Sequence, residues 1–307
     1  MKKIINDAGM WIVFLILFVG VSLFVPNFFS IINMKGLALS VSMVGMVATT
    51  MLFTLAAGHF DLSIESLIAC SGVLAAVVIN ATGSVFLGIT AGLLIGLIVG
   101  LFNGVIIAKF KINALITTLA TMQIVRGMGY IFSDGKAVGI LDEKFFLLGN
   151  SQMLGIPTPI WITAFCFLIF GFLLNKTTFG RDTLAIGGNQ EASRLAGINV
   201  DKRLITIFAL QGMMAAFAGI ILASRMTSGQ PATSQGFALE VISACVLGGV
   251  SLTGGIGSMS GVIVGVLIMG TVQNAMNLLN IEPFYQYVVR GIILLGAVLL
   301  DRYKQKA

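Results

Sequence analysis

Apolar runs long enough to cross a lipid bilayer follow one another along almost the whole chain, and they limit what it can fold into. A helix needs about 20 apolar residues to span a hydrocarbon core, and helices and closed barrels are the structures that satisfy their own backbone there. Only 10% of the 307 residues are charged, whereas soluble domains carry about 25%. We therefore predict an all-α polytopic membrane protein whose residues 1–307 form a single transmembrane domain.

Ten apolar segments are candidate transmembrane helices. Two of them, 67–80 and 238–250, are short for a full crossing, so we expect them to be tilted, partly re-entrant or buried among the others. An even number of crossings puts both ends of the chain on the same side of the membrane. The ten segments are 10–25, 37–57, 67–80, 85–108, 114–132, 160–174, 204–224, 238–250, 260–279 and 284–300.

The placement of the basic residues favours this count and indicates the orientation. Lysine and arginine collect in the cytoplasmic loops of membrane proteins. With the N-terminus inside, twelve basic residues fall in inner intervals and three, Lys35, Lys136 and Lys144, fall in outer ones. Both termini are then cytoplasmic, and the net charge of +6 calls for no nucleic-acid partner. The inner residues are Lys2, Lys3, Lys109, Lys111, Lys176, Arg181, Arg194, Lys202, Arg203, Arg302, Lys304 and Lys306.

The interval 176–203 is the longest polar stretch in this otherwise apolar chain. It holds five basic and three acidic residues and lies on the predicted cytoplasmic side. Its middle, 184–197, is predicted to form a short helix bounded by glycines. A structured loop on the basic side of a membrane protein favours a docking role, and we expect another protein to bind there.

Residues for catalysis or nucleotide binding are not recognisable in the sequence. His59 is the single histidine, and Cys70, Cys166 and Cys245 lie far apart inside apolar segments, so neither a metal site nor a disulfide framework is expected. The chain has no G-x-x-x-x-G-K-[ST] phosphate loop, so a nucleotide that drives transport must bind another chain. The glycine-rich stretch 248–258 lacks the lysine of such a loop and is predicted to be a tight, irregular connection.

Polar residues at membrane depth are costly and often functional. The stretch 58–66 places His59, Asp61, Ser63 and Glu65 between two apolar segments, with no basic residue nearby in the sequence. These residues could line a polar cavity at a broken helix. Alternatively, Asp61 and Ser63 could cap the helix that follows.

A second polar group lies on the segment 114–132. Asn113, Thr117 and Thr121 recur at four-residue spacing and share one helix face, where hydroxyl groups could line a path for a polyhydroxylated solute. Alternatively, threonine hydroxyls can bond to their own helix backbone. A comparable polar patch occurs late in the chain. The candidate path residues are therefore Asp61, Ser63, Asn113, Thr117, Thr121, Gln273 and Asn274.

The two halves of the chain share a short repeated sequence pattern. The pattern E-x-x-x-A-C occurs at 65–70 and again at 240–245. Each copy precedes a segment with glycines at four-residue spacing, which lets helix backbones approach closely. With five spans in each half, the second half is inverted relative to the first, a plan common in transporters. The sequence thus suggests, without requiring, two inverted five-helix halves.

The polar loop and several other stretches resemble one family of membrane proteins. GRDTLAIGGNQEASRLAGI, residues 180–198, is similar to the G-x3-A-x2-G-x-N-x2-A-x4-G-I loop of the ABC sugar-importer permeases that serve ribose, xylose, arabinose and related solutes. GHFDLSIES, NALITTLATMQIVRG and GGVSLTGGIGS match further hallmarks of this family in the same order. Together they cover nearly the whole chain. Longer runs such as LLNKTTFGRDTLAIGGN are most similar to members that import L-arabinose.

The resemblance implies partners and a role for the loop. It implies a homodimer of permease subunits in a bacterial inner membrane, cytoplasmic ATPase subunits that use ATP and Mg, and a periplasmic sugar-binding protein, with no cofactor in this chain. In the family the loop, here 176–203, forms a coupling helix that inserts into the ATPase. His59 and Glu65 depart from the residues usual in the family, which leaves the role of their stretch open. The implied docking residues are Gly180, Arg181, Ala185, Gly187, Asn189, Glu191, Ala192 and Gly197.

These observations lead to one expected function and two alternatives. We expect the membrane subunit of an ATP-driven, binding-protein-dependent importer of L-arabinose or a related pentose, and not an enzyme. The first alternative is a secondary transporter driven by protons or sodium, with Asp61 or Glu65 as its coupling carboxylate. The second is a passive channel. Sugar uptake by the chain alone, with and without an ion gradient, separates the three.

Overall fold

The computed structural model describes residues 2–306, and side chains over residues 9–299. Within this range the chain forms thirteen helices and four two-residue strands. The basic side chains near the two ends, Lys2, Lys3, Arg302, Lys304 and Lys306, lie outside the described side chains. The helices are α1 (Lys2–Phe24), α2 (Ile31–Ala56), α3 (Ile64–Thr82), α4 (Val85–Lys109), α5 (Ala114–Phe132), α6 (Glu143–Asn150), α7 (Thr158–Lys176), α8 (Thr178–Gly188), α9 (Gln190–Leu195), α10 (Val200–Met226), α11 (Phe237–Leu247), α12 (Met259–Leu278) and α13 (Pro283–Lys306), and the strands are β1 (Val138–Gly139), β2 (Gln152–Met153), β3 (Ile156–Pro157) and β4 (Ser228–Gly229).

Each of the ten predicted segments coincides with a helix, and the all-α membrane fold is confirmed. Six helices are long and apolar enough to cross a bilayer, namely α2, α3, α4, α7, α10 and α12. The apolar parts of α1, α11 and α13 are shorter, and α5 has 19 residues but carries Arg126 and three threonines. The six long helices account for part of the ten predicted crossings, and the other four crossings stay predictions.

The segment 67–80 is longer than its apolar run indicated. Helix α3 begins at Ile64 and ends at Thr82, so its 19 residues are enough for a crossing. Gly83 ends the helix in the left-handed conformation, with φ of 68°, and its N–H bonds to the Ile79 carbonyl oxygen, a common way to stop a helix. The segment 238–250 is short as predicted, because α11 has only 11 residues.

The sequence predicts one short helix over 184–197, and the structure has two in its place. Helix α8 ends at Gly188 and α9 begins at Gln190. Asn189 between them is extended, with φ of −161°, and its side-chain oxygen accepts a hydrogen bond from the Ala192 N–H at 2.9 Å. Asparagine is a favoured helix N-cap, so Asn189 starts a second helix and turns the chain.

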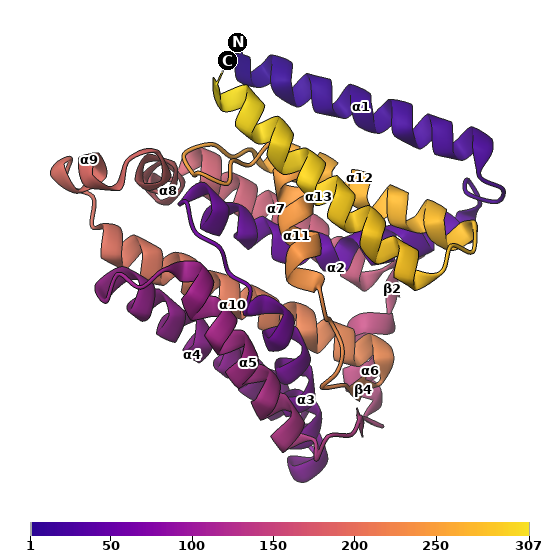
Figure 1. Ribbon diagram of the computed structural model, residues 1–307. Coiled ribbons are helices and arrows are strands. Elements are labelled where there is room, and N and C mark those ends of the chain that lie inside the picture. The colour runs from indigo at the N-terminus through magenta and orange to yellow at the C-terminus, as the bar shows by residue number, and fades with distance from the viewer. Residues whose placement is uncertain (1, 307) are drawn as a thin grey trace.

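The long helices form two packed groups that meet at α2 and α10 (Figure 1). Helix α10 packs against α3 and α4, and α5 packs on α3. Helix α2 packs against α7, α11 and α12, while α1 packs on α12 and α13 on α11. Helices α2 and α10 also pack against each other. The second half of the chain thus supplies α10 to the group built mainly from the first half, and the first half supplies α1 and α2 to the other group.

Close approach of helix backbones holds the first group together. Gly96 of α4 and Gly212 of α10 face each other, and a Cβ on either one would overlap the carbonyl oxygen of the other. Small residues allow membrane helices to pack at such short distances. The four-residue glycine spacing in the sequence therefore serves packing between α4 and α10.

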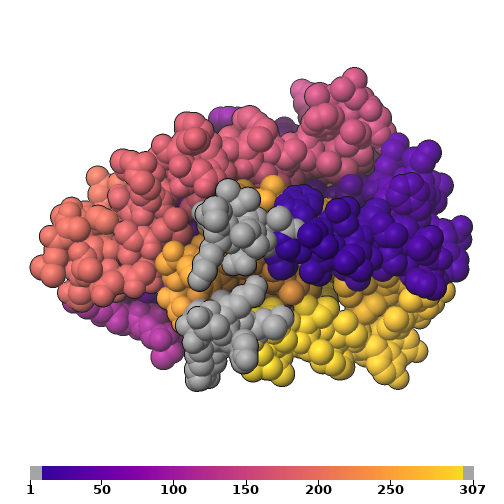
Figure 2. Space-filling view, turned by 90° about the horizontal axis from the view of Figure 1, so that it is seen from above, coloured from indigo at the N-terminus to yellow at the C-terminus, as the bar shows by residue number. Residues whose placement is uncertain are grey.

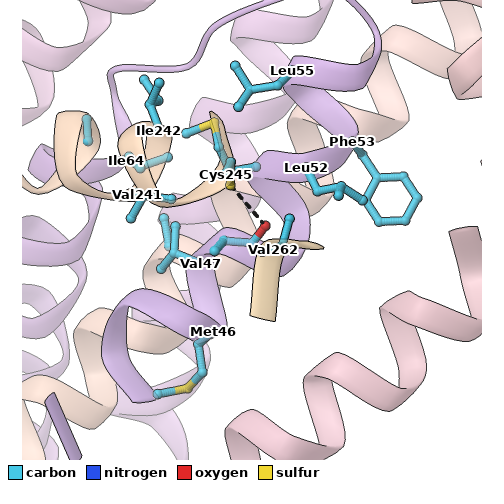
Figure 3. Packing of buried hydrophobic residues seen from close by; sticks show 14 of the residues in the cluster. Met46, Val47, Leu52, Phe53, Leu55, Ile64, Val241, Ile242, Cys245 and Val262 are labelled. Carbon is cyan, nitrogen blue, oxygen red and sulfur yellow. Dashed lines mark hydrogen bonds between the residues drawn. The ribbon is translucent and has the colours of Figure 1, made fainter. Parts of the chain in front are cut away.

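The core of the second group centres on α2 and α11 (Figure 3). Val47 and Leu52 of α2 are fully buried and lie with Val241 and Cys245 of α11 in one cluster. The Cys245 thiol also makes a weak hydrogen bond to the Ala48 carbonyl oxygen, at 3.8 Å. All three cysteines are unpaired and buried, so they serve as packing residues.

The two ends of the long helices differ in what they carry. Helices α8 and α9 project at one end (Figure 1), and Figure 2 shows their salmon-coloured residues at one edge of the molecule. At the opposite end lie α6 and the small antiparallel strand pairs β1–β4 and β2–β3. The predicted docking loop is therefore separated from α6 and the strand pairs by the length of the helix groups.

Candidate docking site

Helix α8 is seated on the rest of the chain through Gly187. A Cβ at this position would overlap the carbonyl oxygen of Ala56, at the end of α2, and the backbone nitrogen of Gly255. Gly255 in turn donates its N–H to the same Ala56 oxygen at 2.8 Å. The adjacent Gly188 has no atom within 4 Å of its Cβ position. Gly187 thus fits α8 closely to the rest of the chain, and Gly188 is free of that constraint.

Gly180 has a similar internal role at the start of α8. A Cβ here would overlap the backbone of Leu174, near the end of α7. The Thr177 hydroxyl caps α8 by accepting a hydrogen bond from the Gly180 N–H at 3.4 Å. The tight turn between α7 and α8 therefore needs a glycine at this position.

Asn189 and Gly197 determine where α9 starts and ends. Asn189 is its N-cap, as described above. Gly197 follows the helix with φ of 86°, a conformation that favours glycine, and its N–H bonds to the Arg194 carbonyl oxygen at 3.0 Å. Both residues therefore shape the loop through its backbone.

The outward face of α8 and α9 carries the side chains that can meet a partner. Arg181 and Ala185 are exposed on α8, and Glu191 and Ala192 on α9. Leu195 at the end of α9 is 89% exposed. Many other exposed apolar residues lie on the long helices that are apolar enough to cross a bilayer. Leu195 instead lies on the polar loop, where a protein partner would remove it from water. Leu195 was not predicted as a docking residue, because nothing in the sequence shows which face of α9 is buried.

Three ion pairs brace the docking loop. Arg203 of α10 contacts Asp182 of α8 at 2.7 Å, and Arg194 of α9 contacts Asp201 of α10 at 2.9 Å. Arg194 also approaches Glu191 at 3.6 Å. Because all of these side chains are partly exposed, each pair is worth only about 0.2–1 kcal/mol. Their main effect is to orient α8 and α9 against α10.

The glycine-rich stretch 248–258 lies beneath α8. Gly254 and Gly255 have positive φ values of 87° and 78°, and a Cβ on them would lie 2.8 Å and 3.0 Å from the Cα atoms of Gly187 and Gly188. The prediction of a tight, irregular connection is confirmed. Its contact with the docking loop was not predicted, because 60 or so residues of chain separate the two stretches.

Asp61 lies in the connection between α2 and α3 and is fully buried. Its Oδ1 accepts hydrogen bonds from the Ser63 N–H at 2.9 Å and the Ser63 hydroxyl at 2.6 Å, and Asn103 of α4 donates to that hydroxyl at 3.0 Å. Burial raises the pKa of Asp61 to about 6, although the two bonds from Ser63 lower it. His59 lies beside Phe208 of α10, with ring centroids 6.2 Å apart. Asp61 and Ser63 therefore close the turn before α3 within a buried polar network.

The polar stripe on α5 faces the protein interior. Thr117 and Thr121 are only 6% and 5% exposed. Their hydroxyls donate to the carbonyl oxygens of Asn113 and Thr117, at 3.0 Å and 3.1 Å. Asn113 is exposed and caps α5 by accepting a hydrogen bond from the Leu115 N–H at 2.8 Å. In this conformation the three residues complete the bonding of their own helix.

The late polar patch on α12 has two separate sets of partners. Asn274 exchanges hydrogen bonds of 2.9 Å with Asn33 of α2. Gln273 donates its amide N–H to Glu240 at 2.9 Å and accepts from Arg290 at 2.6 Å. The candidate path residues are thus distributed over the α2–α3 connection, α5 and α12, each with partners of its own.

Two half-buried ion pairs occupy equivalent places in the two halves of the chain. Glu65, in the first turn of α3, pairs with Arg126 of α5 at 3.7 Å, and Glu240, in the first turn of α11, pairs with Arg290 of α13 at 3.4 Å. All four side chains are between 12% and 22% exposed. The repeated E-x-x-x-A-C pattern marked both glutamates, but their arginine partners were not predicted.

Metal binding has no support among the described residues. No group of three or more histidine, cysteine, aspartate or glutamate side chains there could hold a metal ion. The polar chemistry of this part of the chain consists of ion pairs, helix caps and hydrogen-bonded amides.

Comparisons with known proteins identify the family. Residues 33–298 match the model of a family described as branched-chain amino acid transport system / permease component. The L-arabinose transport system permease protein AraH of Escherichia coli K12 is 67% identical over 305 residues, which cover 99% of this chain and 93% of that protein. The L-arabinose ABC transporter permease protein AraH of Azospirillum brasilense is 56% identical, covering 99% and 89%. The ribose import permease protein RbsC of Bacillus subtilis is 42% identical, covering 98% and 94%. No solved structure matches the chain.

The chain belongs to this family of ABC transporter permeases. Its relatives are named as permease components, so the chain is a multi-pass transport component and not an enzyme. The family resemblance inferred from the polar loop, the 58–66 stretch and the glycine-rich connection is confirmed.

Proposed function

We propose that this chain is the membrane-spanning permease subunit of an ATP-driven, binding-protein-dependent sugar importer that carries L-arabinose. The observation that carries the proposal is full-length identity of 67% and 56% to two permeases named for L-arabinose, against 42% to one named for ribose. A related pentose is the nearest alternative substrate. None of these relatives is named as an ion-coupled transporter.

We propose that the docking loop 176–203 receives the partner ATPase, which binds ATP and Mg. The support is a braced loop with outward side chains at one end of the helix groups, opposite the end that carries α6 and the strand pairs. In this proposal the outward residues meet the ATPase, and the glycines and Asn189 hold the loop in shape. Movement of the loop then drives a rigid-body exchange between inward- and outward-facing arrangements. The proposed docking residues are Gly180, Arg181, Ala185, Gly187, Asn189, Glu191, Ala192, Leu195 and Gly197.

We further propose that residues 1–307 form one domain that crosses a bacterial inner membrane ten times, with both termini in the cytoplasm. Two inverted halves are supported by a repeated pattern of neighbours. Helix α3 packs against α4 and α5 and against α10, and α11 packs against α12 and α13 and against α2. The two Glu–Arg pairs repeat this pattern at the level of side chains.

The proposed importer contains a second copy of this chain and a periplasmic sugar-binding protein. The binding protein would meet the end that carries α6 and the strand pairs. Because it selects the sugar, the path needs only weakly polar lining. The candidate path residues are bonded within the protein in the conformation described, so a path along them requires a second conformation in which sugar hydroxyls replace those bonds. These residues are Asp61, Ser63, Asn113, Thr117, Thr121, Gln273 and Asn274.

Reconstitution tests the proposal. Labelled L-arabinose uptake is measured in vesicles that contain the complete importer with ATP inside, and in vesicles that contain the permease alone under a proton or sodium gradient. We expect uptake only in the complete, ATP-loaded system, with unlabelled L-arabinose competing better than ribose or xylose. Gradient-driven uptake by the permease alone contradicts the proposal, and stronger competition by another pentose changes the substrate.

A further inference from the structure

Helix α11 joins the docking loop to the opposite side of the molecule. At its C-terminal side the connection 248–258 leads to Gly254 and Gly255, which lie against Gly187 and Gly188 of α8. Gly255 also bonds to the end of α2 through Ala56. A movement of α8 toward or away from the molecule therefore acts directly on this connection, because backbone atoms meet there with no flexible side chain between them.

At its N-terminal side, α11 begins at Gly236, which is held by the Glu65–Arg126 pair. Glu65 Oε2 accepts the Gly236 N–H at 2.9 Å. Arg126 donates to the carbonyl oxygens of Pro231 and Thr233, both at 2.8 Å. One ion pair from α3 and α5 thus clamps both the middle and the end of the segment 230–236.

Between these ends α11 is rigidly packed. Its 11 residues span about 16 Å at 1.5 Å per residue. A Cβ on Gly265 or Gly261 of α12 would overlap the carbonyl oxygens of Ala244 or Gly248, and Glu240 is tied to α12 and α13 through Gln273. A tightly packed helix moves as a body and does not bend at one end only.

We propose that α11 and the connection 248–258 form the relay that carries the displacement of α8 to the segment 230–236. Glu65 and Arg126 are the positioning residues of this relay, because they fix the segment to α3 and α5 at its far end. The inference rests on the proposed docking of an ATPase at α8 and α9. It adds which internal element transmits the movement, and which segment on the other side of the molecule responds.

Spin labels in the complete importer test the relay. Single cysteines replace Gln235 in the segment and Leu195 in the docking loop, both exposed, while the three native cysteines are buried. Leu154, 85% exposed between β2 and β3, is the control position. We expect the label spectra at 195 and 235 to change between the nucleotide-free and the ATP-trapped importer, with a much smaller change at 154.

The labels at positions 195, 235 and 154 distinguish failure of the docking proposal from failure of the relay. If the label at 195 does not respond to nucleotide in an importer that has assembled with its ATPase, the docking proposal itself is wrong. If 195 responds and 235 does not, docking stands and the relay is contradicted. An equal response at 154 and 235 also contradicts the relay, because it indicates a movement of the whole end of the molecule.

Two glycine variants, one at the contact with α8 and one control, test the end of the relay that lies at the docking loop. Gly254 and Gly249 have similar φ values, 87° and 83°, but only Gly254 has α8 within reach of its Cβ position. Gly254→Ala is expected to remove the response at 235, and Gly249→Ala to keep it with the same backbone strain. A response that survives Gly254→Ala overturns the relay. If Gly254→Ala does not assemble, Glu65→Gln serves instead, since it weakens the clamp at the other end.

Exchanging the two charges within each Glu–Arg pair tests separately whether the Glu65–Arg126 pair holds the segment 230–236. At the second pair, Gln273 contacts both charges through one amide, so Glu240→Arg with Arg290→Glu can be accommodated by rotating that amide. At the first pair the Gly236 N–H and the carbonyl oxygens of Pro231 and Thr233 fix the polarity. Uptake is therefore expected to fall at least about tenfold more for Glu65→Arg with Arg126→Glu. Equal tolerance of both exchanges contradicts the positioning role.

Discussion

The docking loop and the buried polar groups use the same residue types in opposite ways. In α8 and α9 the charged side chains reach outward or bridge to α10, while glycines press backbone against backbone beneath them. On α5 and in the α2–α3 connection the polar atoms turn inward, where Thr117 and Asp61 bond to their own neighbours. The outward side chains of the loop are therefore accessible to a partner, whereas the inward polar groups hold their own helices and turns in place.

This difference teaches that a polar residue in a membrane protein marks a functional surface only when its bonds are not already taken. Threonine hydroxyls and Oδ1 of the buried Asp61 find partners within one or two turns of chain, whereas Asp61 Oδ2 is buried without one among the described residues. The exposed residues of α9 have no such partners on the long helices. Substitutions in the docking loop and in the inward polar groups test this contrast, and the largest effect is expected in the loop.

Replacement of Gly187 by alanine is expected to have the largest effect. The new methyl group must overlap the Ala56 carbonyl oxygen or displace α8, at a cost of about 1–3 kcal/mol or more. We expect ATP-driven uptake to fall more than about tenfold, because α8 no longer sits on the 254–255 turn. Gly188→Ala is the matched control, since its Cβ meets no atom within 4 Å. Similar uptake in the two variants contradicts the close contact described between Gly187 and the backbone of Ala56 and Gly255.

Truncation of Leu195 to alanine is expected to weaken ATPase binding without affecting the permease fold. The side chain is 89% exposed, so nothing inside the chain depends on it. Its burial against a partner is worth about 1–2 kcal/mol, which predicts a roughly tenfold weaker affinity for the ATPase in a pull-down titration. Leu154→Ala, at an equally exposed site on the other side, should change nothing. Unaltered ATPase affinity in Leu195→Ala removes Leu195 from the docking surface.

Replacement of Asp61 by asparagine is expected to leave uptake within about twofold of the original, since the amide oxygen can still accept both bonds from Ser63. Burial raises the pKa of Asp61, so the ionised carboxylate disfavours the folded state above that pKa and the neutral amide removes this cost. Thermal unfolding of the purified variant at pH 7.5 should therefore be no earlier than that of the original. Loss of uptake in a stably folded Asp61→Asn protein supports the ion-coupled alternative.

The smallest effect is expected from Thr117→Val combined with Thr121→Val. Both hydroxyls bond only within α5, and valine has nearly the same shape, so we expect a stability change of at most about 0.5 kcal/mol. The sugar concentration for half-maximal uptake should not change. An increase of several fold, with uptake otherwise intact, places these hydroxyls in the sugar path.

Helix positions could be predicted from the sequence because apolar runs and caps are local properties. All ten segments coincide with helices, and the tight connection 248–258 was expected from its glycines. The split between α8 and α9 was missed because Asn189 suits a helix interior poorly but not prohibitively, and its capping bond is visible only in three dimensions.

Pairings across long stretches of chain could not be predicted. Glu65 lies 61 residues before Arg126, and nothing in either local pattern selects the other. The resemblance implied docking at Gly187, which stays a prediction, but the packing of Gly187 against Ala56 and Gly255 of its own chain was not predicted. Which face of a glycine-containing helix is pressed against backbone depends on the whole packing and not on the motif.

The central claim is that α8 and α9 receive the ATPase, and thiol cross-linking tests it most directly. Cysteine is placed at position 195 or 154, which are exposed leucines at opposite ends of the molecule. In the complete importer it is coupled to a thiol-specific reagent whose second group, on irradiation, inserts into a C–H bond of a neighbouring chain. We predict an adduct of permease and ATPase from position 195 and none from position 154. An adduct from position 154, or none from position 195 in an assembled and active importer, contradicts the account.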